Sequence, residues 1–261
     1  MRITWSLFKK DFKAVTAFPR FEILLGMFTF TFVGMCLSSV VQPRVFTSLI
    51  QQGDFARAFQ NSFSFFLTSF IFVLPPLLTE ELVAGDYERG TLLALVTYPV
   101  RRSQVLASKF LASLLFSSAV IITPFLFAVA VGSSFNNLAV DPRMLLGYFA
   151  GLMLLSFLLC SVSILTSVLS KRLLVAALAF LGISLCWGIA VAGLAMLLQK
   201  SELAIYAYTE TVRSLIGLIA QPDGHSIFSR EQIVTAVAVQ LVISASSLGL
   251  AYLFFRRKEF K

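Results

Sequence analysis

The sequence predicts an all-α fold, a polytopic membrane protein with six transmembrane helices and an N-terminal amphipathic helix. Of the 261 residues, 58% are hydrophobic and only 13% are charged, whereas soluble domains carry about 25% charged residues. The charges are also confined, because six stretches of at least 21 residues contain none. A helix that crosses a bilayer needs about 20 apolar residues. The expected spans are therefore 23–43, 58–79, 110–132, 144–170, 173–199 and 232–255.

This distribution excludes soluble enzymes and disulfide-rich secreted proteins, and we treat 1–261 as a single transmembrane domain. An outer-membrane barrel is also excluded, because its strands alternate between apolar and polar residues over about 10 positions. Cys36, Cys160 and Cys186 lie in three different expected spans and form no Cys-x-x-Cys motif. We interpret all three as small buried hydrophobic residues.

The basic residues predict the orientation of the chain. With the N-terminus in the cytoplasm, 15 Lys and Arg residues lie in cytoplasmic segments and 6 lie outside, as the positive-inside rule requires. Both termini and the segment 80–109 are then cytoplasmic, and the segment 200–231 is extracytoplasmic. The formal net charge of +8 indicates anionic lipid headgroups at the ends of the spans and no nucleic acid.

We interpret residues 1–21 as an interfacial helix that lies on the cytoplasmic membrane surface. Trp5, Phe8 and Phe12 fall on one helical face, whereas Lys13 points away from it and Lys9 flanks it. An aromatic face beside a lysine-rich face is typical of a helix in the headgroup layer. The alternative is an ordinary basic flank before the first span.

The segment 80–109 is the main cytoplasmic loop and the most polar part of the chain. We expect a helix with an acidic surface that breaks at Gly90, and a second short helix from Thr91 that Pro99 ends. Leu92 and Leu95 give this second helix an apolar face. An exposed apolar face rimmed by charge indicates a docking surface for a cytoplasmic partner. The alternative is a charged connector that rests on the headgroups.

The segment 200–231 is too polar to cross the membrane. It still contains enough apolar residues to form one or two short helices at the outer interface, or helices that dip back into the membrane. Before it, Gly147 and Gly151 form a G-x-x-x-G pair. Such a pair allows two helices to approach closely, and we assign it to packing.

The chemical groups that the chain lacks also restrict its function. No Asp, Glu, His, Lys or Arg lies within the six expected spans, which disfavours a proton-coupled or ion-coupled transporter. The one histidine, His225, lies in the segment 200–231. We expect no catalytic, cofactor-binding or metal-binding residue in this chain. It also contains no G-x-x-x-x-G-K-[ST] phosphate loop, so energy for directed work would come from a partner.

The cytoplasmic loop contains a spaced pattern, Glu88-x-Gly90-Thr91-Leu92-x-x-Leu95-x-x-x-Pro99-x-x-Arg102, with Lys109 ten residues after Pro99. In this spacing and in its position between the second and third spans, it resembles the loop shared by type-2 ABC exporter permeases. The resemblance is detailed over residues 80–109, and the rest of the chain matches the family in organisation. Two positions depart from the pattern: Leu93 stands where an acidic residue is common, and Ser108 where a glycine is common.

The resemblance implies that this loop is similar to the coupling helix that rests in a groove of a cytoplasmic ABC ATPase subunit. ATP and Mg²⁺ would bind to that partner, and closure of two ATPase subunits would drive the loop. The residues carried over at matching positions are Glu88, Gly90, Thr91, Leu92, Leu95, Pro99 and Arg102. The candidate coupling loop also includes their charged neighbours Glu80, Glu81, Asp86, Arg89 and Arg101.

The same resemblance implies a permease subunit that works with a second permease copy, as a homodimer or a related heterodimer, in a prokaryotic cell membrane. Its substrate would be amphipathic or lipid-like and would leave the cytoplasm or the inner leaflet. The N-terminal helix would slide along the membrane lipids, and residues 200–231 would form an outer gate.

Two other functions compete with the exporter permease. One is a non-transporting membrane scaffold or assembly subunit whose loops dock a cytoplasmic partner. The other is a secondary transporter or membrane enzyme, which the absence of charged residues and histidines from the spans disfavours.

Overall fold

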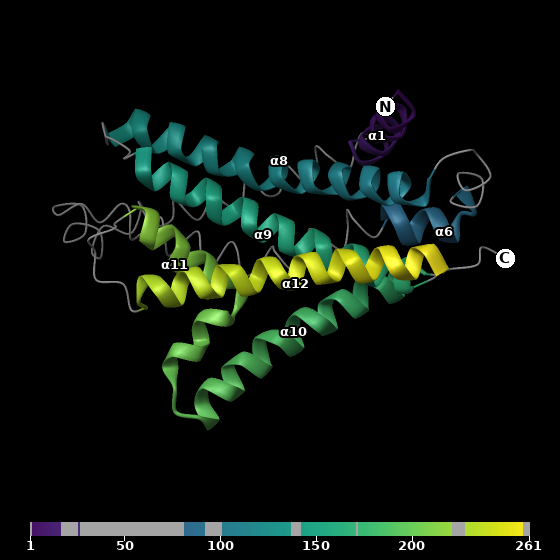
Figure 1. Cartoon of the computed structure of the whole chain (residues 1–261). Coiled ribbons are helices and arrows are strands. Elements are labelled where there is room, and N and C mark those ends of the chain that lie inside the picture. The colour runs from purple at the N-terminus through teal and green to yellow at the C-terminus, as the bar shows by residue number, and fades with distance from the viewer. Residues whose placement is uncertain are drawn as a thin grey trace.

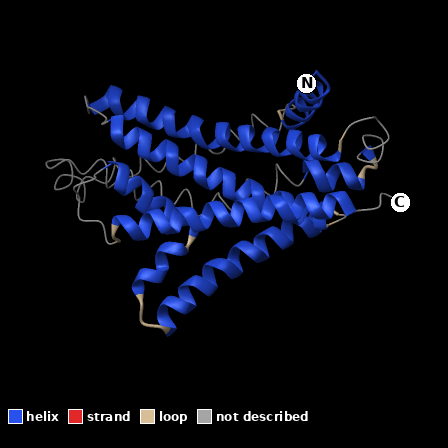
Figure 2. Ribbon diagram, in the orientation of Figure 1, coloured by secondary structure: helices blue, strands red, loops and turns tan. Residues whose placement is uncertain are grey.

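The computed structural model describes residues 2–16, 26, 81–91, 101–136, 142–170, 172–220 and 228–257. Within these ranges all regular secondary structure is helical, so the predicted all-α class is confirmed there (Figure 2). The expected span 58–79 lies outside the described residues, and so does 23–43 apart from Gly26. The same holds for Glu80 and for residues 92–100 of the candidate coupling loop.

The long helices form a bundle (Figure 1). Helices α8, α9 and α12 run side by side, and α10 diverges from them toward the end that carries η2. Helices α1 and α6 lie at one end with the start of α8 and the end of α12, and we call this the loop end. The elements are α1 (Arg2–Val15), η1 (Glu81–Gly85, a π-helical turn), α6 (Asp86–Glu88), α8 (Arg102–Asn136), α9 (Pro142–Leu169), α10 (Leu173–Leu197), η2 (Ser201–Tyr206, a 3₁₀ helix), α11 (Tyr208–Ala220) and α12 (Arg230–Arg257).

Among the described residues, three helices are long and apolar enough to cross a membrane: Leu146–Leu169, Leu173–Leu197 and Arg230–Arg257. They correspond to the fourth, fifth and sixth expected spans. Helix α9 begins at Pro142, whose missing N–H is tolerated in the first turn of a helix. Only two residues separate the end of α9 from the extended residue Arg172, which precedes α10. The fourth and fifth spans are therefore joined by a minimal turn, as expected.

Helix α8 contains the whole expected third span, 110–132, but it begins eight residues earlier, at Arg102. The last part of the predicted loop is thus the first two turns of this helix. The side chain of Gln104 explains the early start, because its Oε1 accepts a hydrogen bond from the backbone N–H of Arg101 at 3.3 Å. This bond satisfies one of the donors that a helix N-terminus leaves free.

Helix α9 is the centre of the bundle and packs against α8, α10, α11 and α12. Its central part is buried, with Leu152, Leu155 and Leu159 among its inaccessible side chains. Helix α10 is the opposite case, because apolar side chains such as Met196 are exposed along it. A helix that is apolar all round but exposed is suited to a hydrocarbon surrounding.

The two described cysteines differ in their surroundings. Cys160 of α9 is buried and Cys186 of α10 is exposed, and both are free thiols. The sequence interpretation is therefore right for Cys160 and wrong for Cys186, because α10 turns much of its surface away from the bundle.

The G-x-x-x-G pair of α9 makes the close contact that was expected of it, and its partner is α11. A Cβ on Gly151 would lie 2.9 Å from Cγ1 of Ile216 and 3.1 Å from Cγ1 of Val212. A Cβ on Gly147 would lie 3.1 Å from the backbone oxygen of Ile216. The two glycines therefore let the short helix α11 lie directly on the backbone of α9.

A carbonyl oxygen at the end of η2 also connects the segment 200–220 to the long helices α10 and α12. The oxygen of Tyr206 accepts hydrogen bonds from Nε1 of Trp187 at 3.2 Å and from Nε2 of Gln240 at 3.0 Å. The hydroxyl of Thr211 closes the junction between η2 and α11 by donating to the oxygen of Ile205 at 2.5 Å. We call this group the Tyr206 junction. It joins η2 to both α10 and α12, although the sequence pattern did not single out Gln240.

Replacement of Gly151 by alanine is expected to destabilise the fold, because the new methyl group would push α11 away from α9. Overpacking of this kind costs about 1–3 kcal/mol. Thermal unfolding of the detergent-solubilised protein measures it, with Gly182→Ala on α10 as the matched control, since nothing lies within 4 Å of a Cβ there. A Gly151→Ala protein that unfolds at the same temperature as Gly182→Ala would contradict the contact.

Candidate functional site

The described part of the candidate coupling loop is a compact turn that reverses at Gly90. The N–H of Arg89 donates to the oxygen of Gly85 at 3.0 Å, and the N–H of Gly90 donates to the oxygen of Tyr87 at 3.1 Å. Gly90 has a φ of +72°, in the left-handed region that glycine adopts without the steric cost of a Cβ. A helix thus breaks at Gly90, as predicted, and the reason is conformational, because a Cβ there would meet nothing within 4 Å.

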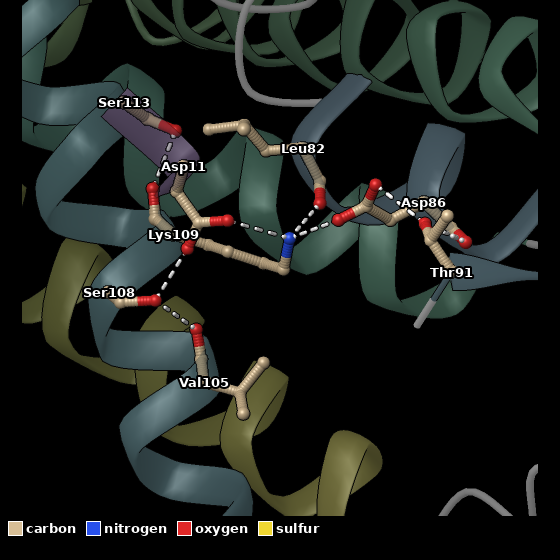
Figure 3. A network of polar contacts seen from close by, with 8 residues as sticks. All are labelled: Asp11, Leu82, Asp86, Thr91, Val105, Ser108, Lys109 and Ser113. Atoms are coloured by element: carbon tan, nitrogen blue, oxygen red, sulfur yellow. Dashed lines mark hydrogen bonds and ion pairs between the residues drawn. The ribbon is translucent and has the colours of Figure 1, made fainter. Parts of the chain in front are cut away.

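Thr91 closes this turn onto Asp86. Its Oγ1 lies 2.8 Å from Oδ1 of Asp86 and 3.1 Å from the backbone oxygen of the same residue. The hydroxyl therefore restrains the carboxylate of Asp86 from the solvent side. The other carboxylate oxygen points inward, toward Nζ of Lys109 (Figure 3).

The inward oxygen of Asp86 contacts the ammonium group of Lys109, which is buried. Nζ of Lys109 lies 2.5 Å from Oδ2 of Asp86, 2.5 Å from the backbone oxygen of Leu82 and 3.5 Å from Oδ1 of Asp11 (Figure 3). An ammonium group has three N–H donors, so each has one acceptor. These acceptors come from α6, from η1 and from α1.

Asp11 of α1 contacts two consecutive residues of α8. Its Oδ1 faces Lys109, and its Oδ2 accepts a hydrogen bond from Oγ of Ser108 at 2.6 Å. Ser108 is one of the two departures from the family pattern, and its hydroxyl has an acceptor on the N-terminal helix. Beside these polar contacts, Leu7 of α1 packs in one buried layer with Val105 and Leu106 of α8.

We call Asp11, Leu82, Asp86, Thr91, Ser108 and Lys109 the Lys109 cluster. Lys109 is 0% exposed and Asp11 is 4% exposed, so these two charges are almost entirely removed from water, whereas the side chain of Asp86 is 22% exposed. Removing one partner of a buried ion pair leaves an uncompensated charge and costs about 3–5 kcal/mol. The cluster therefore requires α1, the loop and α8 to be present together in this arrangement.

The sequence interpretation of Lys109 is wrong in one respect. It treated Lys109 as a basic residue at the end of a span, with headgroups as its natural partners, whereas the structure buries it between three segments of the chain. Asp11 was not identified either. A signal was present, because Asp11 is the only acidic residue in 1–21 and lies four positions from Leu7, on the helix face away from the lysines.

Two further loop residues contact the ends of other long helices. Oε2 of Glu88 accepts a hydrogen bond from the N–H of Leu173, the first residue of α10, at 3.3 Å. A carboxylate is favourable there because a helix N-terminus carries partial positive charge. At the other side, Nη1 of Arg102 donates to the oxygen of Arg256 in the last turn of α12 at 2.6 Å.

Four other described residues of the candidate coupling loop lie at the surface. Arg89, Gly90, Thr91 and Arg101 are exposed, and Glu81 begins the π-helical turn. The surface that the structure shows is thus a turn from 88 to 91, beside Arg101. The apolar residues Leu92 and Leu95, and Pro99, lie outside the described residues.

Helix α1 forms as predicted, but a different face of it contacts the protein. Leu7 and Asp11 are buried, whereas Trp5 is 68% exposed and Phe8 and Phe12 are half-buried. The three aromatic rings stack along the helix, with centroids 5.4 Å apart for the first pair and 5.8 Å for the second. This aromatic row lies between the buried face and the exposed lysines Lys9, Lys10 and Lys13.

In the described part of the chain, no three His, Cys, Asp or Glu residues come together in a way that could hold a metal ion. The two carboxylates of the Lys109 cluster are instead engaged by the ammonium group and by two hydroxyls. The arrangement joins segments of the chain and presents a turn at the surface. It defines a multi-pass helical membrane protein whose polar loop is anchored to its long helices.

Comparison with known protein families identifies this class. A family model described as ABC-2 family transporter protein matches residues 5–260, and the chain belongs to that family. It is a membrane transport permease, and members of this family are transmembrane subunits that pair with an ABC ATPase subunit. A search of the curated proteins found no match.

Replacement of Gly90 by alanine is expected to loosen the turn, because a Cβ in the left-handed region costs about 1–2 kcal/mol. An energy of that size corresponds to a factor of about 5–30 in a local equilibrium, so amide hydrogen exchange of residues 86–91 should accelerate by that factor. Asparagine tolerates this conformation better than alanine, and Gly90→Asn should exchange more slowly than Gly90→Ala. Equal exchange in the wild type and Gly90→Ala would contradict the role of φ.

Proposed function

We propose that the chain is the permease subunit of an ATP-driven ABC exporter, which moves an amphipathic or lipid-like substrate out of the cytoplasm or the inner leaflet. The energy comes from a separate ATPase subunit that binds ATP and Mg²⁺. The observation that supports this proposal is the anchoring of an exposed turn, 88–91, to a buried charge cluster. A surface turn that is anchored to a buried ion pair can pass a displacement by the ATPase on to the helices.

The contacts of the turn indicate where that force would go. Through Asp86 the turn is joined to Lys109 in α8, and through Glu88 it is joined to the first residue of α10. The start of α8 is joined in turn to the end of α12 through Arg102. A displacement of the turn would therefore reach three of the long helices at their ends, and their long apolar segments would transmit it through the membrane.

Within this proposal the loop end is cytoplasmic, and the ATPase contacts the exposed charged residues Glu88, Arg89 and Arg101 together with the apolar residues Leu92 and Leu95. Asp86 has a different role. Its carboxylate is engaged by Lys109 and Thr91, so we assign it to the anchoring of the turn instead of to contact with the ATPase.

The remaining parts of the chain have roles consistent with export. Helix α1 lies in the headgroup layer, with the aromatic row toward the acyl chains and the lysines toward the phosphates. The segment 200–220 forms part of an outer gate. Its helix α11 lies against Gly147 and Gly151 of α9. Two permease copies form the pathway, and the exposed apolar surface of α10 faces lipid or the second copy.

The pairing with an ATPase is tested by co-purification, with a phosphate-loop ATPase subunit as the expected partner. The detergent-solubilised wild type should retain that subunit and its vanadate-sensitive ATP hydrolysis. Leu92→Glu/Leu95→Glu should reduce retention at least tenfold, because two buried charges at an apolar contact are unfavourable. Glu202→Arg, an exposed charge reversal on η2, is the matched control and should retain the ATPase fully.

Two results would overturn the exporter proposal. The first is a wild-type protein that never retains the ATPase in detergent or in nanodiscs. The second is retention that the double substitution leaves unchanged. Retention of the ATPase without any nucleotide-dependent change in the permease would instead favour the scaffold function.

The position of α1 is tested with its own tryptophan. The chain has two tryptophans, so Trp187→Phe leaves Trp5 as the single fluorophore. In nanodiscs that contain lipids brominated near the headgroup end of the acyl chain, we expect the emission of Trp5 to be quenched, because the ring lies in that layer. Unquenched emission, equal to that in unbrominated lipid, would show that α1 lies away from the membrane.

A further inference from the structure

We propose that α1, residues 81–91 (η1, α6 and the turn at Gly90) and the first two turns of α8 move as one rigid unit. Lys109 is the positioning residue that holds them together. This inference rests on the proposed function and adds a division of the permease into moving parts. It also adds to the expectation that α1 slides along the membrane lipids, because α1 would then move together with the loop and α8.

Lys109 is in contact both with α1 and with the loop residues 81–91. Its three N–H donors face Asp86, the oxygen of Leu82 and Asp11, which belong to α1 and to the adjoining elements η1 and α6. Hydrogen bonds depend steeply on distance and angle. A displacement of any one element by more than a fraction of an ångström would leave a buried charge without its acceptor, and such a charge is strongly unfavourable away from water.

Helix α1 is joined to α8 at two consecutive residues. The carboxylate of Asp11 contacts Nζ of Lys109 with one oxygen and Oγ of Ser108 with the other. A carboxylate held at both oxygens can neither translate along α8 nor rotate. Leu7, one helical turn before Asp11, is buried in the layer formed with Val105 and Leu106, so the whole inner face of α1 rests on α8.

An apolar layer lies between this unit and the rest of the bundle. The buried layer continues with Ile164 and Val168 of α9 and with Ala251 and Phe255 of α12. These contacts are apolar, and the hydrophobic effect has no preferred direction. The hydrogen bonds from the N–H of Leu173 to Glu88 and from Arg102 to the oxygen of Arg256 also cross this boundary, and both are exposed. Sliding is therefore less costly at this boundary than within the unit.

The rigid unit is tested by distances between spin labels in the full-length permease. Labels at Lys13→Cys in α1 and Ser103→Cys in α8 report on the inside of the unit, and both positions are exposed. Labels at Ser103→Cys and Leu174→Cys, the latter in the exposed first turn of α10, report across its boundary. The native cysteines are replaced by alanine or serine in both labelled proteins.

In the permease alone, the 13–103 distance distribution should be narrow, and Lys109→Met should broaden it. Asp11→Asn is the second variant, because it keeps the acceptor for Ser108 and weakens only the ionic contact, so it should broaden the distribution less. Lys10→Met, an exposed lysine of the same helix, is the control and should leave it unchanged. A distribution that stays narrow in both Lys109→Met and Asp11→Asn would overturn the role of Lys109.

With the ATPase bound and trapped by ATP and vanadate, the 13–103 distance should stay the same while the 103–174 distance shifts. In Lys109→Met the ATPase should remain bound, but the 103–174 shift should be lost, a result that a merely structural role would not produce. A 13–103 distance that shifts in the wild type on trapping would overturn the rigid unit. Failure to bind the ATPase would count against the proposed function alone, since the measurements on the isolated permease still decide the inference.

Discussion

The burial of one ammonium group, that of Lys109, is the constraint on which the loop end depends. A charge without water around it must find other partners, and Lys109 finds them on α1 and on the adjoining elements η1 and α6, which are far from α1 in sequence. The position of α1 on α8, the inward direction of Asp86 and the orientation of the turn at Gly90 all follow from this requirement.

In the part of the chain that the structure describes, the Lys109 cluster at the loop end and the Tyr206 junction that holds the segment 200–220 are two groups of directional contacts. Between them the helices pack mainly through apolar and small side chains around α9. This distribution suits a transport protein, because polar contacts define which segments move together and apolar contacts allow neighbouring helices to shift. The family assignment and the structure therefore support the same general role, although they come from different evidence.

Much of the fold was predictable from the pattern of charges. Stretches without charge correspond to α9, α10 and α12 almost to the residue, because the cost of charge in hydrocarbon acts on each segment separately. The break at Gly90 and the close approach at Gly151 were also predictable from short segments, since both depend on a local property of glycine. The inner face of α1 was not predicted, because the aromatic residues dominate its pattern, whereas Leu7 and Asp11 make the contacts with α8.

The sequence by itself determined that this chain is a helical membrane protein with a polar loop of the ABC permease pattern, since these properties depend on composition and on spacing within short segments. Only the tertiary structure decided what the loop rests on. Asp11 and Lys109 are 98 positions apart, and no local periodicity records that they pair. Their contact depends on the path of the whole chain, because a buried charge is stabilised by whichever acceptors the fold brings within reach.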